Sequence, residues 1–210
     1  MSIAESPLLG PMRKSMGNFT TYSLNGMNIV RSKAFKIKDP KTEKQLIMRA
    51  RMTTMAKVYR TFKRILCLGF PENSSGKSPQ NMLVSVNFTS AFEMVDAMPV
   101  ISYPLLQLSK GSLPEVKVLE AVVDAEGITV RYDADLSSDN VFATDEMVAC
   151  ALLKDESLLI TRQIRGYESL GTIQLKYPTL QADEVACCYV FTRSGDGKKA
   201  SDTRYVEVKG

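Results

Sequence analysis

Residues 39–68 read DPKTEKQLIMRARMTTMAKVYRTFKRILCL, and the organisation of the chain depends on this stretch. Its apolar residues recur every three or four positions, the spacing that places side chains on one face of an α-helix. The stripe consists of Met48, Met52, Met55, Tyr59, Phe62 and Leu66. It predicts one long helix over about 43–68. Thr42 and Gln45 stand where a capping box would satisfy free N–H groups of the first helical turn.

The predicted helix is followed by a motif that resembles the end of a phosphate-binding loop. Residues 69–78 read GFPENSSGKS, but six residues separate Gly69 from Gly76, whereas a phosphate-binding loop has four residues between its glycines. Pro71, which has no N–H to donate, stands where the first glycine would be. We therefore expect Gly69 to end the helix in the left-handed conformation, and residues 73–78 to form a polar loop.

The helix also carries a set of basic side chains on or near the side away from its apolar stripe. A charged helix face is usually solvated, but an array of Lys and Arg also binds the phosphates of nucleic acid or an acidic protein. Both interpretations are open. Together with the segment before the helix, the candidate contacts for an anionic partner are Lys33, Lys36, Lys38, Arg49, Arg51, Lys57, Arg60, Lys63 and Arg64.

The residues before the helix predict an extended arm that contains a hairpin. Residues 1–17 are rich in Gly, Pro, Met and Ser. Two apolar runs, 19–24 and 27–31, flank Asn25-Gly26, the pair that a two-residue hairpin turn favours. Residues 32–38 then alternate basic with apolar side chains, which predicts a further strand with one basic face.

The residues after the helix change in character at about position 113. Residues 79–92 form a short amphipathic segment, and residues 99–108 form an apolar, strand-like run. Seven short runs rich in β-branched and aromatic residues follow, separated by turn signals. They are Val116–Val123, Ile128–Tyr132, Met147–Leu153, Leu158–Ile164, Gly171–Tyr177, Val185–Thr192 and Arg204–Val208. Such a series is typical of an immunoglobulin-like or fibronectin-III-like sandwich.

The predicted fold class is therefore α+β, with two regions. Residues 1–112 form a basic N-terminal region that contains the extended arm, the hairpin, the long helix, a linker and a strand. Residues 113–210 form an immunoglobulin-like or fibronectin-III-like β-sandwich.

Charge is distributed unevenly along the chain. Residues 1–66 contain 14 Lys/Arg and 3 Asp/Glu, a net charge of +11, and residues 67–210 contain 13 and 20, a net charge of −7, which together give +4. A basic segment joined to an acidic body suits an anionic partner such as nucleic acid, and it equally suits contact between copies of the chain.

The composition argues against most enzyme classes. The chain has no histidine, which removes the usual Ser and Cys triads and most zinc sites. Its four cysteines, Cys67, Cys150, Cys187 and Cys188, form no C-x-x-C pair, and we expect them to be buried small hydrophobes. Carboxylate pairs such as Asp145 with Glu146 stand in predicted turns, where such residues are usually solvated turn formers. We predict a protein that is not an enzyme and that has no cofactor and no metal.

The N-terminus lacks the charged and apolar regions of a Sec signal peptide, and the sequence contains no apolar run long enough to span a membrane. The expected location is a virion or the cytoplasm.

Several positions carry a resemblance to a family of uncharacterised proteins from Bacteroidota. Its signature is G…VR…P-x-T-x-x-Q-x-x-x-R. The matching residues here are Gly17, Val30, Arg31, Pro40, Thr42, Gln45 and Arg49, and residues 190–205 are similar to that family's closing strands. The helix start is also loosely similar to that of small phage virion-associated proteins. Neither resemblance implies an activity or a catalytic residue. It implies that Arg31, Thr42 and Gln45 fix the fold or an interface.

These observations favour a non-enzymatic structural or assembly protein, either a virion component or a self-assembling subunit. Its N-terminal arm would contact neighbouring subunits, so the expected partner is a second copy or another structural protein. The first alternative is a nucleic-acid-binding protein that uses the basic arm and helix. The second is an adhesion or carbohydrate-binding module that uses the loops of the sandwich, an inference by analogy with other sandwich proteins.

Overall fold

The structure is a computed structural model of the 210-residue chain. The described residues group into two compact units, Met1–Thr42 and Glu43–Gly210. We call the first unit the arm and the second the body. The predicted boundary between residues 112 and 113 falls inside the body. The structure describes residues 2–3, 14–24, 26–34, 39–71, 77–96, 98–124, 126–133 and 140–209.

The arm is a small antiparallel sheet with the strand order β1-β4-β3-β2. Its central hairpin, β3–β4, confirms the predicted hairpin, and Gly26 of its turn has a φ of 79°, which glycine adopts without steric cost. Its strands are β1 (Ser2–Ile3), β2 (Lys14–Met16), β3 (Phe19–Leu24) and β4 (Met27–Ser32).

The strand predicted over residues 32–38 is wrong at positions 33 and 34. The paired strand β3 begins at Phe19, which lies opposite Ser32, so the ladder has no further partner beyond that pair. The last backbone bond runs from the N–H of Lys33 to the carbonyl of Asn18, at 2.8 Å. Residues 35–38 lie outside the described part of the chain.

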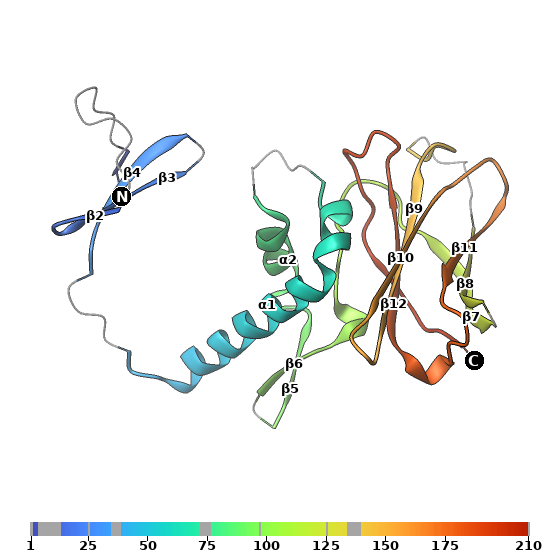
Figure 1. The fold of residues 1–210 in the computed structure, drawn as a ribbon, viewed down its shortest axis with the longest axis horizontal. Coiled ribbons are helices and arrows are strands. Elements are labelled where there is room, and N and C mark those ends of the chain that lie inside the picture. The colour runs from blue at the N-terminus through green and yellow to red at the C-terminus, as the bar shows by residue number, and fades with distance from the viewer. Residues whose placement is uncertain are drawn as a thin grey trace. The chain divides into compact units, whose positions relative to one another are not determined.

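The body begins with the long helix α1 (Glu43–Gly69), which confirms the predicted helix (Figure 1). The buried residues of α1 are Met55, Val58, Phe62, Ile65, Leu66 and Gly69. They all lie at or after Met55, which is near the middle of the helix. The first three turns therefore carry the same apolar stripe without burying it, because Met48 and Met52 remain exposed.

Gly69 ends the helix for a different reason from the predicted one. Its φ is not positive, so the left-handed cap is wrong. A Cβ at this position would clash with the carbonyl oxygen of Leu108 and lie 2.7 Å from the Cβ of Ser109. Glycine is needed here because the backbone of residues 108–109 passes directly over the end of the helix.

The middle of the chain forms a second helix and a hairpin. The amphipathic segment contains α2 (Pro79–Asn87), and the side chain of Ser78 accepts a hydrogen bond from the N–H of Asn81 at 3.3 Å. The strands β5 (Phe92–Val95) and β6 (Met98–Ile101) then pair as an antiparallel hairpin. The strand-like run predicted over 99–108 is wrong beyond Ile101, because Pro104 cannot donate to a ladder and Tyr103–Leu105 form the 3-10 helix η1.

Each of the seven strand-like runs contains a strand. In chain order these are β7 (Lys117–Asp124), β8 (Gly127–Asp133), β9 (Glu146–Leu153), β10 (Leu158–Ile164), β11 (Leu170–Lys176), β12 (Val185–Arg193) and β13 (Arg204–Val206). They form two antiparallel sheets, β11-β8-β7 and β10-β9-β12-β13. A second 3-10 helix, η2 (Ala182–Glu184), precedes β12. The α+β architecture is therefore confirmed.

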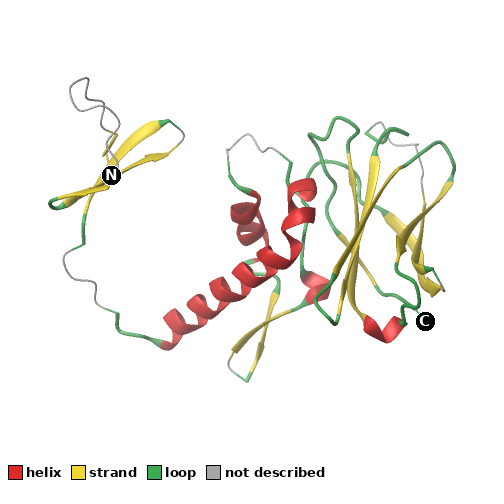
Figure 2. Cartoon of the chain, viewed as in Figure 1, coloured by secondary structure: helices red, strands yellow, loops and turns green. Residues whose placement is uncertain are grey.

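The sheet β10-β9-β12-β13 is covered on both faces. Alternate residues of β9, such as Met147 and Ala149, pack against the other sheet, whereas Val148 and Cys150 pack against α1, α2 and residues 106–108. Because every residue of β9 after Glu146 is buried, this strand has no solvent face. Figure 2 shows both helices of the body gathered beside its strands.

Polar contacts hold residues 77–112 together and bind them to the rest of the body. The side-chain amide of Asn87 donates to the carbonyl of Gln107 at 2.8 Å, and its oxygen accepts from the N–H of Gln107 at 2.7 Å. Thr203, near the C-terminus, accepts hydrogen bonds from the N–H groups of Leu108 and Ser109 at 3.0 and 2.7 Å. The segment before β7 is thus part of the same compact unit as the two sheets.

The cysteines follow the alternation of the strands. Cys187 packs with the helices and Cys188 packs between the sheets, so these adjacent side chains point to opposite faces of β12 and both are buried as predicted. Burial raises the pKa of Cys187 to about 11 and that of Cys188 to about 12, and it raises the pKa of Cys150 well above the ordinary thiol value. Cys67 differs from the prediction because it lies on the solvent side of α1 and is exposed.

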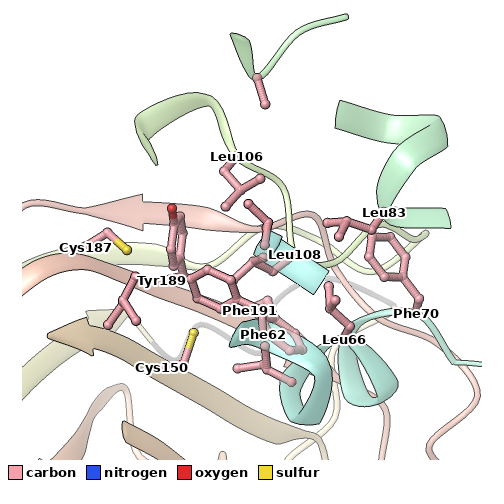
Figure 3. Packing of buried hydrophobic residues seen from close by; sticks show 14 of the residues in the cluster. Phe62, Leu66, Phe70, Leu83, Leu106, Leu108, Cys150, Cys187, Tyr189 and Phe191 are labelled. Carbon is pink, nitrogen blue, oxygen red and sulfur yellow. The ribbon is translucent and has the colours of Figure 1, made fainter. Parts of the chain in front are cut away.

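Tyr189 of β12 connects the sheet β10-β9-β12-β13 to α1 and to the 3-10 helix η1. Its ring meets the ring of Phe62 edge to face, with a centroid distance of 6.1 Å, and its hydroxyl donates to the carbonyl of Tyr103 at 2.8 Å (Figure 3). A buried Tyr hydroxyl needs such a partner, since it would otherwise be desolvated without compensation.

We expect Tyr189→Phe to lower the free energy of unfolding by about 1 kcal/mol, because it removes one buried hydrogen bond and retains the ring. Urea unfolding followed by circular dichroism measures the change. Tyr205→Phe is the matched control, since its ring lies 5.7 Å from that of Tyr189 on the same sheet. A decrease in the control that equals the decrease in Tyr189→Phe would contradict this assignment.

We expect Cys67 to be the thiol that reacts in the native protein, because Cys150, Cys187 and Cys188 are buried and their raised pKa values suppress the reactive thiolate. Labelling with a chromogenic disulfide at pH 8 should modify one cysteine of the native chain and all four in urea. Cys67→Ser should abolish the native reaction. Rapid native labelling of that variant would show that the strands are not packed as described.

Candidate interaction surfaces

The exposed face of α1 brings together Lys57, Arg60 and Arg64, with Lys63 beside them. These four side chains are exposed, and the buried residues of the same turns point to the opposite side of the helix. No other described residue forms an ion pair with any of the four. This cluster is a compact basic surface, and we call it the basic face.

The other predicted basic contacts of α1 lie nearer its start. Arg51 is half-buried: it donates to the carbonyl of Phe88 at 3.4 Å, and its guanidinium carbon lies 5.5 Å from the centre of the Phe92 ring. This side chain therefore connects α1 to the hairpin β5–β6 and is not available as the sequence suggested. Arg49 is exposed, and its carbonyl accepts a hydrogen bond from the hydroxyl of Thr53 at 3.0 Å.

The predicted contacts of the arm belong to a separate compact unit. Arg31 is exposed and lies over the ring of Tyr22, with 5.9 Å from its guanidinium carbon to the ring centre. Lys33 is exposed. Lys36 and Lys38 lie outside the described residues.

Thr42 and Gln45 lie at the start of α1. The helix begins at Glu43, so Thr42 directly precedes it and Gln45 is its third residue, the spacing that a capping box requires. Both side chains are exposed. The reciprocal capping bonds stay a prediction.

The hairpin β5–β6, which we call the ribbon, is a candidate surface that the sequence analysis missed. Its register pairs Glu93 with Val100 and Val95 with Met98, so these four side chains share one face, while the buried Phe92 and Pro99 lie on the other. Val95, Met98 and Val100 are all exposed. The sequence signal for the ribbon was Asp96, because an Asp between two apolar runs favours a turn. In the structure Asp96 lies in that turn with a φ of 49°.

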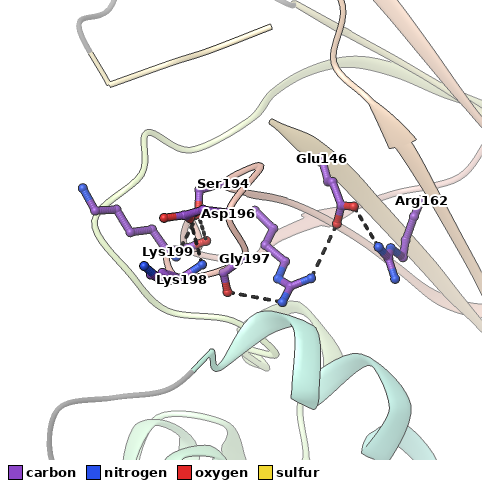
Figure 4. A network of polar contacts seen from close by, with 8 residues as sticks. Glu146, Arg162, Ser194, Asp196, Gly197, Lys198 and Lys199 are labelled. Carbon is purple, nitrogen blue, oxygen red and sulfur yellow. Dashed lines mark hydrogen bonds and ion pairs between the residues drawn. The ribbon is translucent and has the colours of Figure 1, made fainter. Parts of the chain in front are cut away.

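A polar network crosses three strands at one end of the sheet β10-β9-β12-β13 (Figure 4). The carboxylate of Glu146 accepts a hydrogen bond from Arg162 at 2.7 Å and lies 3.6 Å from a guanidinium nitrogen of Arg193. Arg193 also donates to the carbonyl of Gly197 at 3.2 Å. Glu146 thus joins its two neighbouring strands.

The turn after Arg193 is held by its own side chains. The hydroxyl of Ser194 donates to the carboxylate of Asp196 at 2.6 Å, and the N–H of Lys198 donates to the same oxygen at 3.0 Å. The hydrogen bond from Ser194 is the main reason that the pKa of Asp196 is lowered. The carboxylate of Asp196 and the hydroxyl of Ser194 therefore have hydrogen-bond partners within the turn, and no ligand is needed to account for them.

A shallow depression of about 340 Å³ lies between this turn and residues 140–145. Among its lining residues, Asp145 is buried and its carboxylate accepts a hydrogen bond from the N–H of Phe142 at 2.9 Å. Asp145 and Glu146, the carboxylate pair of the sequence analysis, thus both have structural contacts. The adhesion or carbohydrate site predicted for the loops of the sandwich stays a prediction.

Two features are not found among the residues that the structure describes. Neither helix in the described ranges has the length and hydropathy of a membrane-spanning segment. Within the same ranges, no group of three His, Cys, Asp or Glu side chains could hold a metal ion.

Comparison with known proteins gives a family and no activity. No curated protein and no solved structure matches the chain. A family of unknown function, DUF6266, matches residues 11–207, which include most of the arm and nearly all of the body. The expected membership of an uncharacterised family is confirmed, while the resemblance to Bacteroidota and phage proteins stays a prediction. The chain belongs to the family of unknown function DUF6266.

Proposed function

We propose that the protein is a non-enzymatic assembly protein whose arm contacts a neighbouring subunit, either in a virion or in a particle built from copies of this chain. The observation that carries this proposal is that the described side chains of the arm do not form a core. Among the arm side chains that the structure describes, Ile29 is the one hydrophobic residue that is buried.

An isolated arm, Met1–Thr42, would lie close to the smallest size at which a chain folds without help. Units of about 40 residues usually need disulfides, metals or association to remain folded. The arm, Met1–Thr42, contains no cysteine or histidine that could supply the first two. Association is then the remaining source of stability.

The arm also presents an apolar face. Register places Tyr22, Leu24, Met27 and Ile29 on the same side of the hairpin β3–β4. Leu24 and Met27 are exposed and Tyr22 is half-buried. An apolar sheet face on a unit without a core gains stability when a second surface covers it.

We also infer that the seven strands β7 to β13 of the body form a fibronectin-III-like sandwich. In the immunoglobulin constant arrangement, strands A to G form the sheets ABED and CFG. Lettered in the same order, the strands here form the sheets β11-β8-β7, which is EBA, and β10-β9-β12-β13, in which the fourth strand pairs with the third. That transfer of the fourth strand favours the fibronectin type III version. Such sandwiches occur widely as building blocks of larger assemblies, which is an argument by analogy.

Light scattering coupled to size-exclusion chromatography tests the proposed assembly. The full chain should form oligomers whose population rises with concentration, and a variant that lacks residues 1–42 should remain monomeric because the contacting arm is gone. The truncated variant keeps the whole body, so its circular dichroism should retain the signal of α1 and the two sheets. A full chain that stays monomeric at every concentration would overturn the proposal.

The basic face favours a second candidate function, nucleic-acid binding. Lys57, Arg60 and Arg64 form a row along α1 that could neutralise successive phosphates. We expect the chain to bind a DNA duplex with a dissociation constant that rises steeply with salt. The triple variant K57Q/R60Q/R64Q should reduce the salt slope by about 0.9 for each phosphate that it no longer neutralises. Fluorescence anisotropy measures both quantities. An absence of binding at low salt would exclude this candidate.

A further inference from the structure

We propose that the outward face of the ribbon, formed by Glu93, Val95, Met98 and Val100, is the surface on which the arm of a second copy docks. This inference rests on the proposed assembly function and names the surface that would receive the arm.

The first argument is that both faces of the ribbon are apolar. Phe92 and Pro99 are buried on the inner face. On the outer face Val95, Met98 and Val100 are 50%, 60% and 47% exposed, and Glu93 is the remaining member. A hairpin with one face in water normally alternates apolar with polar residues. The outer face of the ribbon breaks this alternation in favour of burial against another surface.

The second argument is that the first turns of α1, which pack against the inner face of the ribbon, carry exposed apolar residues of their own. α1 packs against β6, and Arg51 of α1 lies over the ring of Phe92 in β5. Leu46, Met48 and Met52 of the first turns are each about half exposed. Methionine side chains adapt to irregular partners, so Met48, Met52 and Met98 suit a surface that closes around another chain.

The third argument is the charge of the two surfaces. Residues 1–42 contain 7 Lys/Arg and 2 Asp/Glu, a net charge of +5. The ribbon carries exposed acidic groups, Glu93 on its outer face and Asp96 in its turn, and no basic residue. Arg31 lies on the same face of the arm as Tyr22, which places a cation at the border of the apolar face. Opposite charges at the rim of an apolar contact favour this pairing over others.

The sizes of the surfaces also agree. Each ribbon strand has four residues and each central arm strand has six, which correspond to lengths of roughly 13 and 20 Å. The central strands of the arm are therefore long enough to cover the outer face of the ribbon. The apolar side chains of β3 and β4 would be covered by this contact.

Charge insertion into the ribbon tests the surface. Val95→Lys with Met98→Lys places two cations against the basic arm, and we expect the concentration for half-maximal oligomer formation to rise at least about tenfold. Ile164→Lys with Leu170→Lys is the matched control, because these residues are 65% and 63% exposed at a different place in the body. Light scattering should show normal assembly of the control variant. Normal assembly of the ribbon variant as well would overturn the inference and leave the proposed function intact.

A cysteine-trapping experiment identifies the occupant without relying on a failure of assembly. Two full-length chains, both with Cys67→Ser, carry either Met27→Cys on the arm or Met98→Cys on the ribbon, and one of them bears a tag that changes its mass. Mixing them under mild oxidation should give a disulfide-linked species that contains both chains. A chain with both cysteines that forms only an intramolecular disulfide would overturn the inference, since each arm would then cover its own ribbon. Monomeric full-length protein would overturn both this inference and the proposed function.

Discussion

The sheet β10-β9-β12-β13 needs cover on both of its faces, and the arrangement of residues 43–210 follows from that need. β9 and β12 are apolar at nearly every position, so neither face of these strands can remain in water. The second sheet covers one face, and the second half of α1 with residues 106–108 covers the other. The helix is thus a structural layer of the body. The backbone of Leu108 passes closely over Gly69 at the end of this helix, and the ring of Tyr189 packs against Phe62 of the same helix.

The arm and the ribbon, each considered by itself, have an apolar face that their own described strands do not cover. Both are small antiparallel structures with an apolar face, and neither has enough buried surface of its own for stability. Within the described residues, Ile29 is the only buried hydrophobic residue of the arm, and the outer ribbon face has none. Two uncovered apolar faces in one sequence are a stability cost for a monomer. If copies associate, each apolar face covers the other, and this cost is removed.

Periodicity in the sequence was sufficient for the long helix and the seven strands, because both patterns repeat over many residues. It failed where a residue's role depends on a distant segment. Gly69 was predicted as a left-handed cap, but glycine is needed there because the backbone of Leu108 passes close to it. Arg51 resembles the other basic residues in sequence, but in the structure its guanidinium lies over the ring of Phe92. The ribbon was missed because Pro99 and a turn without glycine weaken the hairpin signal. The uncovered faces could not be recognised, since exposure follows only from the packing of the whole body.

The uneven charge of the chain gives a physical reason why the arm would contact a ribbon rather than another arm. Two arms would bring together apolar faces, but each carries a net charge of +5, and like charges disfavour that pairing. The acidic ribbon removes this penalty. At physiological ionic strength charges act over about 8 Å, so they would orient the arm during the last part of its approach, while the apolar contact would supply most of the affinity. The match of the family to residues 11–207 includes both surfaces, which is the arrangement that an arm and its receiving surface within one protein require.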